Sequence, residues 1–83
     1  MIDVRTVSEF KNGFVQDAIN IEWQDISSIK DEFEKNQKIY LYCRSGNRSG
    51  KAGDILIKLG FKNVENLGSL ENASKYLKKK VIK

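Results

Sequence analysis

The chain has 83 residues, of which 40% are hydrophobic and 31% are charged, as expected for one small globular domain rather than a disordered segment. Its formal net charge is +4, but lysines crowd the C-terminal end, so we interpret the surplus as a solvated helix end and not as a nucleic-acid-binding surface. With one cysteine and no histidine, the chain cannot form an internal disulfide and offers no zinc site and no Cys-His catalytic pair.

The first half of the chain predicts two short strands, each followed by a helix. Residues 2–4 form an apolar start that fits a strand. The pattern Thr6-Val7-Ser8-Glu9 is a capping box, which predicts a short helix ending near residue 11. Residues 18–21 predict the second strand. Residues 24–36 carry isoleucines and a phenylalanine on one face and charges on the other, so they predict the second helix.

The second half repeats the alternation. Residues 38–42 give the strongest strand signal in the chain, because they are apolar and aromatic. A helix follows the loop after Cys43 and should end at Gly60, a residue suited to the left-handed position after a helix. Residues 63–67 predict a fourth strand. Ser69 is expected to cap a last helix that runs through Lys79.

This alternation of strands and helices predicts an α/β fold, namely a small parallel four-stranded sheet flanked by helices, in a single domain over residues 1–83. Right-handed crossovers limit the possible topologies. If strands two and three lie on opposite sides of strand one, the strand order is 2-1-3-4. The topological switch point, at which the strand order reverses, then falls between strands one and three, and ligands bind at such points in parallel sheets. Asp3 and Arg5, at the end of strand one, should lie beside the loop that follows strand three.

The loop that follows strand three contains the candidate catalytic and binding residues. Cys43 ends the third strand, and the loop amides together with the positive end of the next helix should stabilise a thiolate there. Two arginines within the same tight loop favour an anion site, and a glycine supplies the backbone freedom that inward-pointing N–H groups require. The candidate catalytic residue is therefore Cys43, and the candidate binding residues are Arg44, Ser45, Gly46, Asn47 and Arg48.

Each of these residues also has an ordinary structural explanation. A lone cysteine at the end of a strand is often a small buried hydrophobic residue. Arg44 and Arg48 could be surface charges, and Gly46 could be a plain turn glycine. We prefer the functional interpretation of Cys43 because a core residue does not need a loop of polar and flexible residues after it.

Four stretches, in this order, resemble the single-domain rhodaneses, and in particular their short phage-shock type. They are Asp3-Val4-Arg5 with Glu9-Phe10, Ala18-Ile19-Asn20-Ile21, Cys43-Arg44-Ser45-Gly46-Asn47-Arg48-Ser49, and Gly60-Phe61-Lys62-Asn63-Val64. The resemblance covers nearly the whole chain. The sequence departs from the family at residues 13–17, where a His-Ile-Pro-Gly pattern is common, and at Ser69, which replaces a glycine.

The resemblance implies a thiosulfate sulfurtransferase, an enzyme that moves sulfane sulfur from thiosulfate or a similar donor to cyanide or a thiol. Cys43 would carry the sulfur as a persulfide, cradled by the loop from Arg44 to Arg48. Asp3, Arg5 and Ser49 would support the loop. The spacing Cys-x4-Arg is similar to that of the sulfur-transferring branch, whereas the related phosphatases have one residue more.

Two alternatives remain open. One is a non-catalytic binding or sulfur-sensing module with the same fold, and the other is a phosphatase or arsenate reductase. For the enzyme we expect no cofactor and no metal, a small anionic sulfur donor, and an acceptor that is cyanide or a thiol, with a thiol-carrying protein as one form of that acceptor. We expect a monomer without nucleic-acid or membrane partners, located in the cytoplasm, or in the periplasm if a leader was removed.

Overall fold

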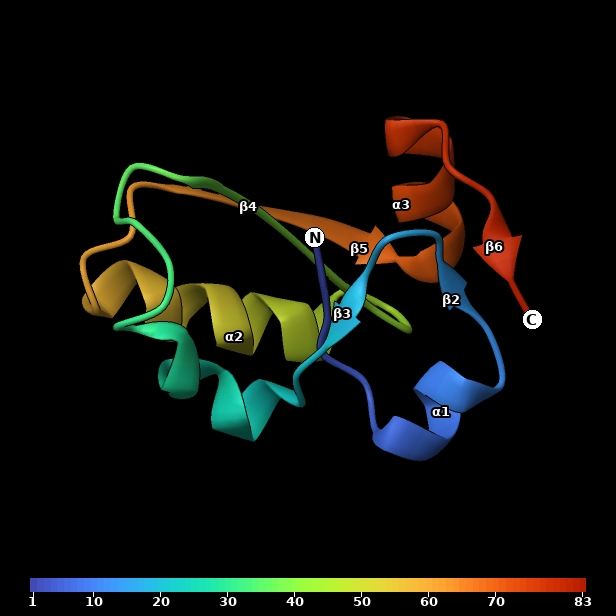
Figure 1. The fold of residues 1–83 in the computed structure, drawn as a ribbon, viewed down its shortest axis with the longest axis horizontal. Helices are drawn as coiled ribbons and strands as arrows, with labels where there is room; N and C mark the ends of the chain where they lie inside the picture. Colours follow the sequence, from blue (N-terminus) through green and yellow to red (C-terminus); the bar gives the residue numbers. More distant parts are fainter.

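A four-stranded parallel sheet forms the centre of the computed structural model, which describes all 83 residues (Figure 1). Its strands are β1 (Ile2–Asp3), β3 (Ile19–Asn20), β4 (Lys38–Cys43) and β5 (Asn63–Ser69). They lie in the order β3–β1–β4–β5, and all three pairings are parallel. Counted as the four predicted strands, this is the predicted order 2-1-3-4, so the predicted α/β fold is confirmed.

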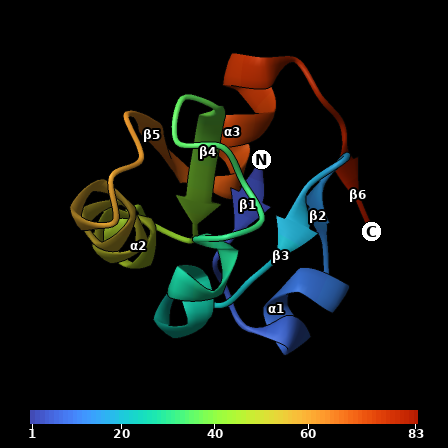
Figure 2. The same ribbon diagram turned by 60° about the vertical axis from the view of Figure 1, so that its left-hand side comes forward.

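Alternating side chains of β4 build a core on each face of the sheet. Ile39, Leu41 and Cys43 point to one face and pack under α2 (Asn47–Lys58) and the 3-10 helix η1 (Trp23–Ile29). Tyr42 points to the other face, where α3 (Leu70–Leu77) packs. Figures 1 and 2 show α2 and α3 on opposite sides of β4. With both faces covered, β4 is buried at its centre, which explains its nearly continuous apolar sequence.

The helix boundaries follow the signals in the sequence. Before α1 (Val7–Lys11), the Thr6 hydroxyl accepts a hydrogen bond from the backbone N–H of Glu9, and the Glu9 carboxylate accepts one from the backbone N–H of Thr6. This is the predicted capping box. Gly60 follows α2 with a φ of 98°, and the Ser69 side chain caps α3, both as predicted. However, α3 ends at Leu77 and not at Lys79, because Lys78 adopts the left-handed conformation.

The helix predicted over residues 24–36 is wrong in type and length. The chain forms the 3-10 helix η1, which ends at Ile29, and turns follow. Ile26 and Ile29 are three residues apart, and in a 3-10 helix that spacing places both side chains on the same face, where both are buried. Ser27 and Ser28 between them are weak helix formers, so nothing local extends the element into an α-helix.

A second, two-stranded sheet was not predicted. The strands β2 (Phe14–Val15) and β6 (Val81–Ile82) pair in antiparallel fashion and bring the C-terminal end of the chain beside α1 (Figure 2). Each strand has only two residues, so neither has a detectable periodicity. No helix here combines the length and apolar character that crossing a membrane requires.

Candidate active site

Cys43 is the last residue of β4, and its side chain is fully buried at the carboxyl end of the sheet. The chain then curls around the sulfur before α2 begins. The backbone N–H of Gly46 donates a hydrogen bond to Sγ at 3.0 Å, and that of Ser49 does so at 3.5 Å. A single sulfur atom is therefore held by inward-pointing amides next to the positive end of a 12-residue helix.

Gly46 gives the loop its shape. It adopts the left-handed conformation, with a φ of 97°, and it is the residue that immediately precedes α2. A Cβ atom at this position would lie 3.3 Å from the Cα of Gly68. Both the backbone conformation and the close approach of β5 therefore require glycine here. The interpretation of Gly46 as a plain turn residue misses its second constraint, which is packing against β5.

The environment of Cys43 favours the thiolate. Burial by itself raises the pKa of this thiol, but hydrogen bonds from the Ser49 hydroxyl and from the backbone N–H groups of Ser49, Ser45 and Gly46 outweigh burial. The net effect is a lowered pKa. No histidine is needed for this activation, because fixed backbone dipoles and one hydroxyl supply it.

The Ser49 hydroxyl connects the sulfur to β5. Its oxygen lies 3.3 Å from Cys43 Sγ and donates to the side-chain oxygen of Asn66 at 2.6 Å. The orientation of the Asn66 amide is fixed, since its nitrogen donates to the Gly46 carbonyl and its oxygen accepts from the N–H of Gly68. A hydroxyl has only one proton. While the Ser49 hydroxyl donates that proton to Asn66, it can accept a hydrogen bond from a protonated thiol but cannot donate one to the thiolate. It must rotate to donate to the thiolate.

We therefore expect Ser49→Ala to raise the pKa of Cys43 by roughly one unit, because a hydrogen bond to a charged sulfur is lost and the competing bond to Asn66 offsets part of its value. Cys43 is the only thiol, so the pH dependence of alkylation by iodoacetamide reports this pKa directly. Ser45→Ala is the matched control, because that side chain is exposed and makes no hydrogen bond. Equal alkylation profiles for Ser49→Ala and the native chain would exclude this role.

The two arginines of the loop differ. Both terminal nitrogens of Arg48 donate to the Glu9 carboxylate, at 2.7 and 3.0 Å, so this guanidinium joins α2 to α1. Arg44 is exposed and forms neither a hydrogen bond nor an ion pair with the protein. Of the two, only Arg44 is free to meet an anion without first losing a partner.

The Glu9–Arg48 pair should make stability depend on pH. The hydrogen bond from Arg48 lowers the pKa of Glu9 from 4.5 to about 2, with burial opposing it and bonds from Thr6 assisting it. The folded-state pKa is depressed, so the stabilisation is complete above about pH 4.5 and is lost as the pH falls towards about 2. About a quarter of each side chain is exposed, so solvent screening limits the contribution.

Glu9→Gln should therefore lower the free energy of unfolding by about 1 kcal/mol at neutral pH, as expected for a screened pair with good geometry. The difference from the native chain should shrink between about pH 4.5 and pH 2, because protonation then removes the same charge from the native chain. Urea unfolding of both chains across this range measures the difference. A gap that stays constant over the whole range would show that the ion pair does not stabilise the fold.

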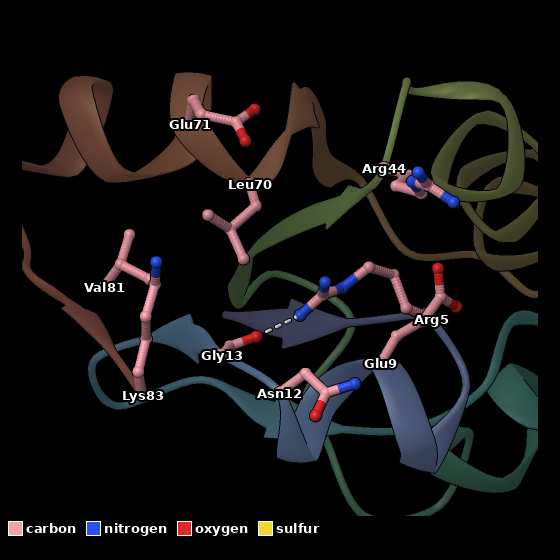
Figure 3. Close-up of a pocket in the computed structure, with 9 residues that line it drawn as sticks. All are labelled: Arg5, Glu9, Asn12, Gly13, Arg44, Leu70, Glu71, Val81 and Lys83. Atoms are coloured by element: carbon pink, nitrogen blue, oxygen red, sulfur yellow. Dashed lines mark hydrogen bonds between the residues drawn. The ribbon is translucent and has the colours of Figure 1, made fainter.

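Asp3 and Arg5 form a buried pair beside the loop. The Asp3 carboxylate accepts hydrogen bonds from the backbone N–H of Arg5 and from its Nε and Nη2 atoms, at 2.7 to 3.1 Å. Arg5 Nη2 also donates to the Gly13 carbonyl. Burial alone would lower the pKa of Arg5, but the hydrogen bonds and charge of Asp3 raise it. Arg5 and Arg44 both line a hollow next to the loop (Figure 3).

The structure thus brings Cys43, Arg44, Gly46, Arg48 and Ser49 together with the supporting residues from the end of β1. The side chains of Ser45 and Asn47 are exposed and make no hydrogen bond, although the N–H of Ser45 faces the sulfur.

The sequence analysis did not identify Asn66, and it placed Glu9 in the helix cap and in a stretch of the family resemblance without giving it a role in the site. Asn66 lies 20 residues from Gly46, and no local pattern marks it. Glu9 could be explained fully as a cap, although two arginines in one loop indicate that an acidic partner is needed.

The fold and the loop together define an α/β domain with a buried thiol that is held by loop amides at the carboxyl end of a central parallel strand. The rhodanese-like domain family matches residues 1–75, which is most of the chain. The chain belongs to this family, so the resemblance found in the sequence is confirmed.

Three relatives illustrate the similarity. Thiosulfate sulfurtransferase PspE of Escherichia coli is 36% identical over 76 residues, which cover 86% of this chain and 70% of that protein. A putative mitochondrial thiosulfate sulfurtransferase of Schizosaccharomyces pombe is 38% identical over 81 residues, covering 80% of this chain and 56% of that protein. A solved structure of a rhodanese with anions from E. coli matches with a TM-score of 0.78 at 36% identity, over 86% of each chain. The chain therefore spans only part of the full-length relatives.

Proposed function

We propose that the chain is a sulfurtransferase that accepts sulfane sulfur on Cys43 and passes it to an external nucleophile. The observation that carries this proposal is the sulfur of Cys43 inside a ring of loop donors, the nearest being the Gly46 N–H at 3.0 Å. The names of its relatives, thiosulfate sulfurtransferases in a bacterium and a yeast, support the same reaction class.

The proposed reaction has two displacements. The Cys43 thiolate attacks the outer sulfur of thiosulfate, a new S–S bond forms, and sulfite leaves with the electron pair of the old one. The persulfide sulfur then sits among the loop amides, which stabilise negative charge without reorganising. The acceptor, cyanide or a thiolate, takes the outer sulfur and restores the Cys43 thiolate. The chain has no second cysteine, so the acceptor must come from outside.

The two arginines receive different roles. Arg44 has no partner in the protein and lies next to the nucleophile, so we assign it the binding of the anionic donor and of the departing sulfite. Arg48 binds both oxygens of Glu9, so it fixes the position of the end of the loop. Its positive charge acts on the donor mainly at long range.

We expect a loop of this length to permit sulfur transfer but not the hydrolysis of phosphate esters. A turnover assay with thiosulfate and cyanide, run beside one with an aryl phosphate, should give activity only in the first. Inserting one glycine after Gly46 should weaken sulfur transfer, because the inward N–H groups move away from a single sulfur atom. Alkylation of Cys43 in the insertion variant is the control for an accessible thiol. Efficient hydrolysis of the aryl phosphate by the native chain would refute the proposal.

A further inference from the structure

Asn66 contacts the cysteine loop at two points, although it belongs to another strand, β5. Its Nδ2 atom donates a hydrogen bond to the Gly46 carbonyl at 3.0 Å, and its Oδ1 atom accepts one from the Ser49 hydroxyl at 2.6 Å. Oδ1 also accepts from the backbone N–H of Gly68 at 2.9 Å. A flipped amide would place donor against donor at Gly68 and acceptor against acceptor at Gly46, so the acceptor Oδ1 is the atom that faces Ser49.

The Ser49 hydroxyl has one proton and two acceptors for it. Its oxygen lies 2.6 Å from Asn66 Oδ1 and 3.3 Å from Cys43 Sγ. Ser49 is fully buried, so bulk water does not offer a third acceptor. An uncharged sulfur is a weak acceptor, and a thiolate is a strong one. The proton therefore goes to Asn66 while Sγ is uncharged, and the two acceptors compete for it once Sγ is charged.

We propose that Asn66 is a positioning residue for sulfur transfer, which competes for the Ser49 proton and so favours the states of Cys43 in which Sγ carries no charge. Those states are the thiol and the persulfide. This inference rests on the proposed sulfur transfer. When the thiolate attacks thiosulfate, an S–S bond forms to Sγ, and sulfite leaves with the electron pair of the S–S bond that breaks. The negative charge then lies on the outer sulfur, and the Ser49 proton returns to Asn66.

The charged groups around Cys43 are unchanged by a substitution of Asn66 with a neutral side chain. Their effect on the thiolate therefore cancels when such a variant is compared with the native chain. On the surrounding elements these groups are Asp3 and Arg5 at the end of β1, Glu9 on α1, Glu22 and Asp25 at η1, Arg44 in the loop, Arg48 and Lys51 on α2, and Glu65 on β5.

Asn66→Leu tests the competition, because leucine has the same number and branching of side-chain heavy atoms but accepts no hydrogen bond. The variant also loses the contact with the Gly46 carbonyl, but that loss acts on the loop whether or not residue 49 has a hydroxyl. A double-mutant cycle with Ser49→Ala separates the two effects. Below the pKa of Cys43, Asn66→Leu should raise the ratio of thiolate to thiol roughly two- to tenfold more in the native chain than in the Ser49→Ala chain. The pH dependence of alkylation by iodoacetamide measures each ratio.

The loading equilibrium gives a second readout. Each chain is incubated with mixtures of thiosulfate and sulfite at a pH above the pKa of Cys43 in every variant, and the intact mass gives the fraction that carries sulfur. Asn66→Leu should shift this equilibrium away from the persulfide by roughly two- to tenfold more in the native chain than in the Ser49→Ala chain. The matched control is Asn63→Leu, which should change neither readout. It removes an amide from the other end of β5, where Asn63 donates to the Asn36 carbonyl.

Circular dichroism checks that each variant is folded. Equal effects of Asn66→Leu in the native and Ser49→Ala chains, in either measurement, would overturn the proposal and leave Asn66 as a brace of the loop. A difference of the opposite sign would also overturn it. If the native chain takes up no sulfur but the alkylation cycle shows the expected difference, the proposed function is wrong and the competition for the Ser49 proton stands. If the native chain takes up sulfur but the alkylation cycle shows no difference, sulfur transfer stands and the role of Asn66 is wrong.

Discussion

Cys43→Ala should lower sulfur transfer from thiosulfate to cyanide by on the order of a thousandfold or more, because the variant has no atom that can form the persulfide. The side chain is small and fully buried in the core beneath α2, so alanine should fit there with little change in the fold. Cys43→Ser is the matched variant, since it keeps an atom of similar size at the sulfur position but cannot hold sulfane sulfur. The initial rate of thiocyanate formation measures the loss, and circular dichroism checks that each variant is folded.

Transfer by either variant at a rate close to that of the native chain would mean that the covalent route through Cys43 is wrong. A thousandfold loss in both, with native circular dichroism, assigns the loss to the chemistry of the thiol and not to the fold.

Asp3→Asn should cost about 3–5 kcal/mol in the free energy of unfolding, because the Arg5 guanidinium would remain buried without its counter-charge. A domain of this size is stable by only roughly 4–12 kcal/mol, so the variant should lose a large part of its stability. Urea unfolding followed by the fluorescence of Trp23, the only tryptophan, measures the change.

Glu65→Gln is the matched control for Asp3→Asn. It removes the carboxylate of an ion pair with Lys38 in the same sheet, but both of those side chains are more than a third exposed. Its cost should therefore stay below about 1 kcal/mol. Similar costs for the two variants would contradict the view that burial makes the Asp3–Arg5 pair important.

The sheet and the cysteine loop could be predicted because their signals are local. The apolar run before Cys43 indicates a buried strand, and Gly46 with the amphipathic pattern after it indicates a loop and a helix. The capping residues Thr6 and Ser69 fixed the starts of two helices in the same way. The right-handedness of parallel crossovers then limited the possible strand orders.

The parts that could not be predicted depend on contacts between distant residues. The choice between an α-helix and a 3-10 helix after Trp23 is decided by how Ile26 and Ile29 pack, which their spacing alone does not determine. The pairing of Glu9 with Arg48 spans 39 residues, and that of Ser49 with Asn66 spans 17. These two contacts determine which arginine is free and where the Ser49 proton lies.

The most direct test of the proposed function is the intact mass of the chain after incubation with thiosulfate and removal of excess donor. We expect the mass of one added sulfur atom, located at Cys43, and we expect cyanide to restore the original mass. The gain should be absent from Cys43→Ala. An unchanged mass in the native chain, or the same gain in the alanine variant, would contradict the persulfide on which the account depends.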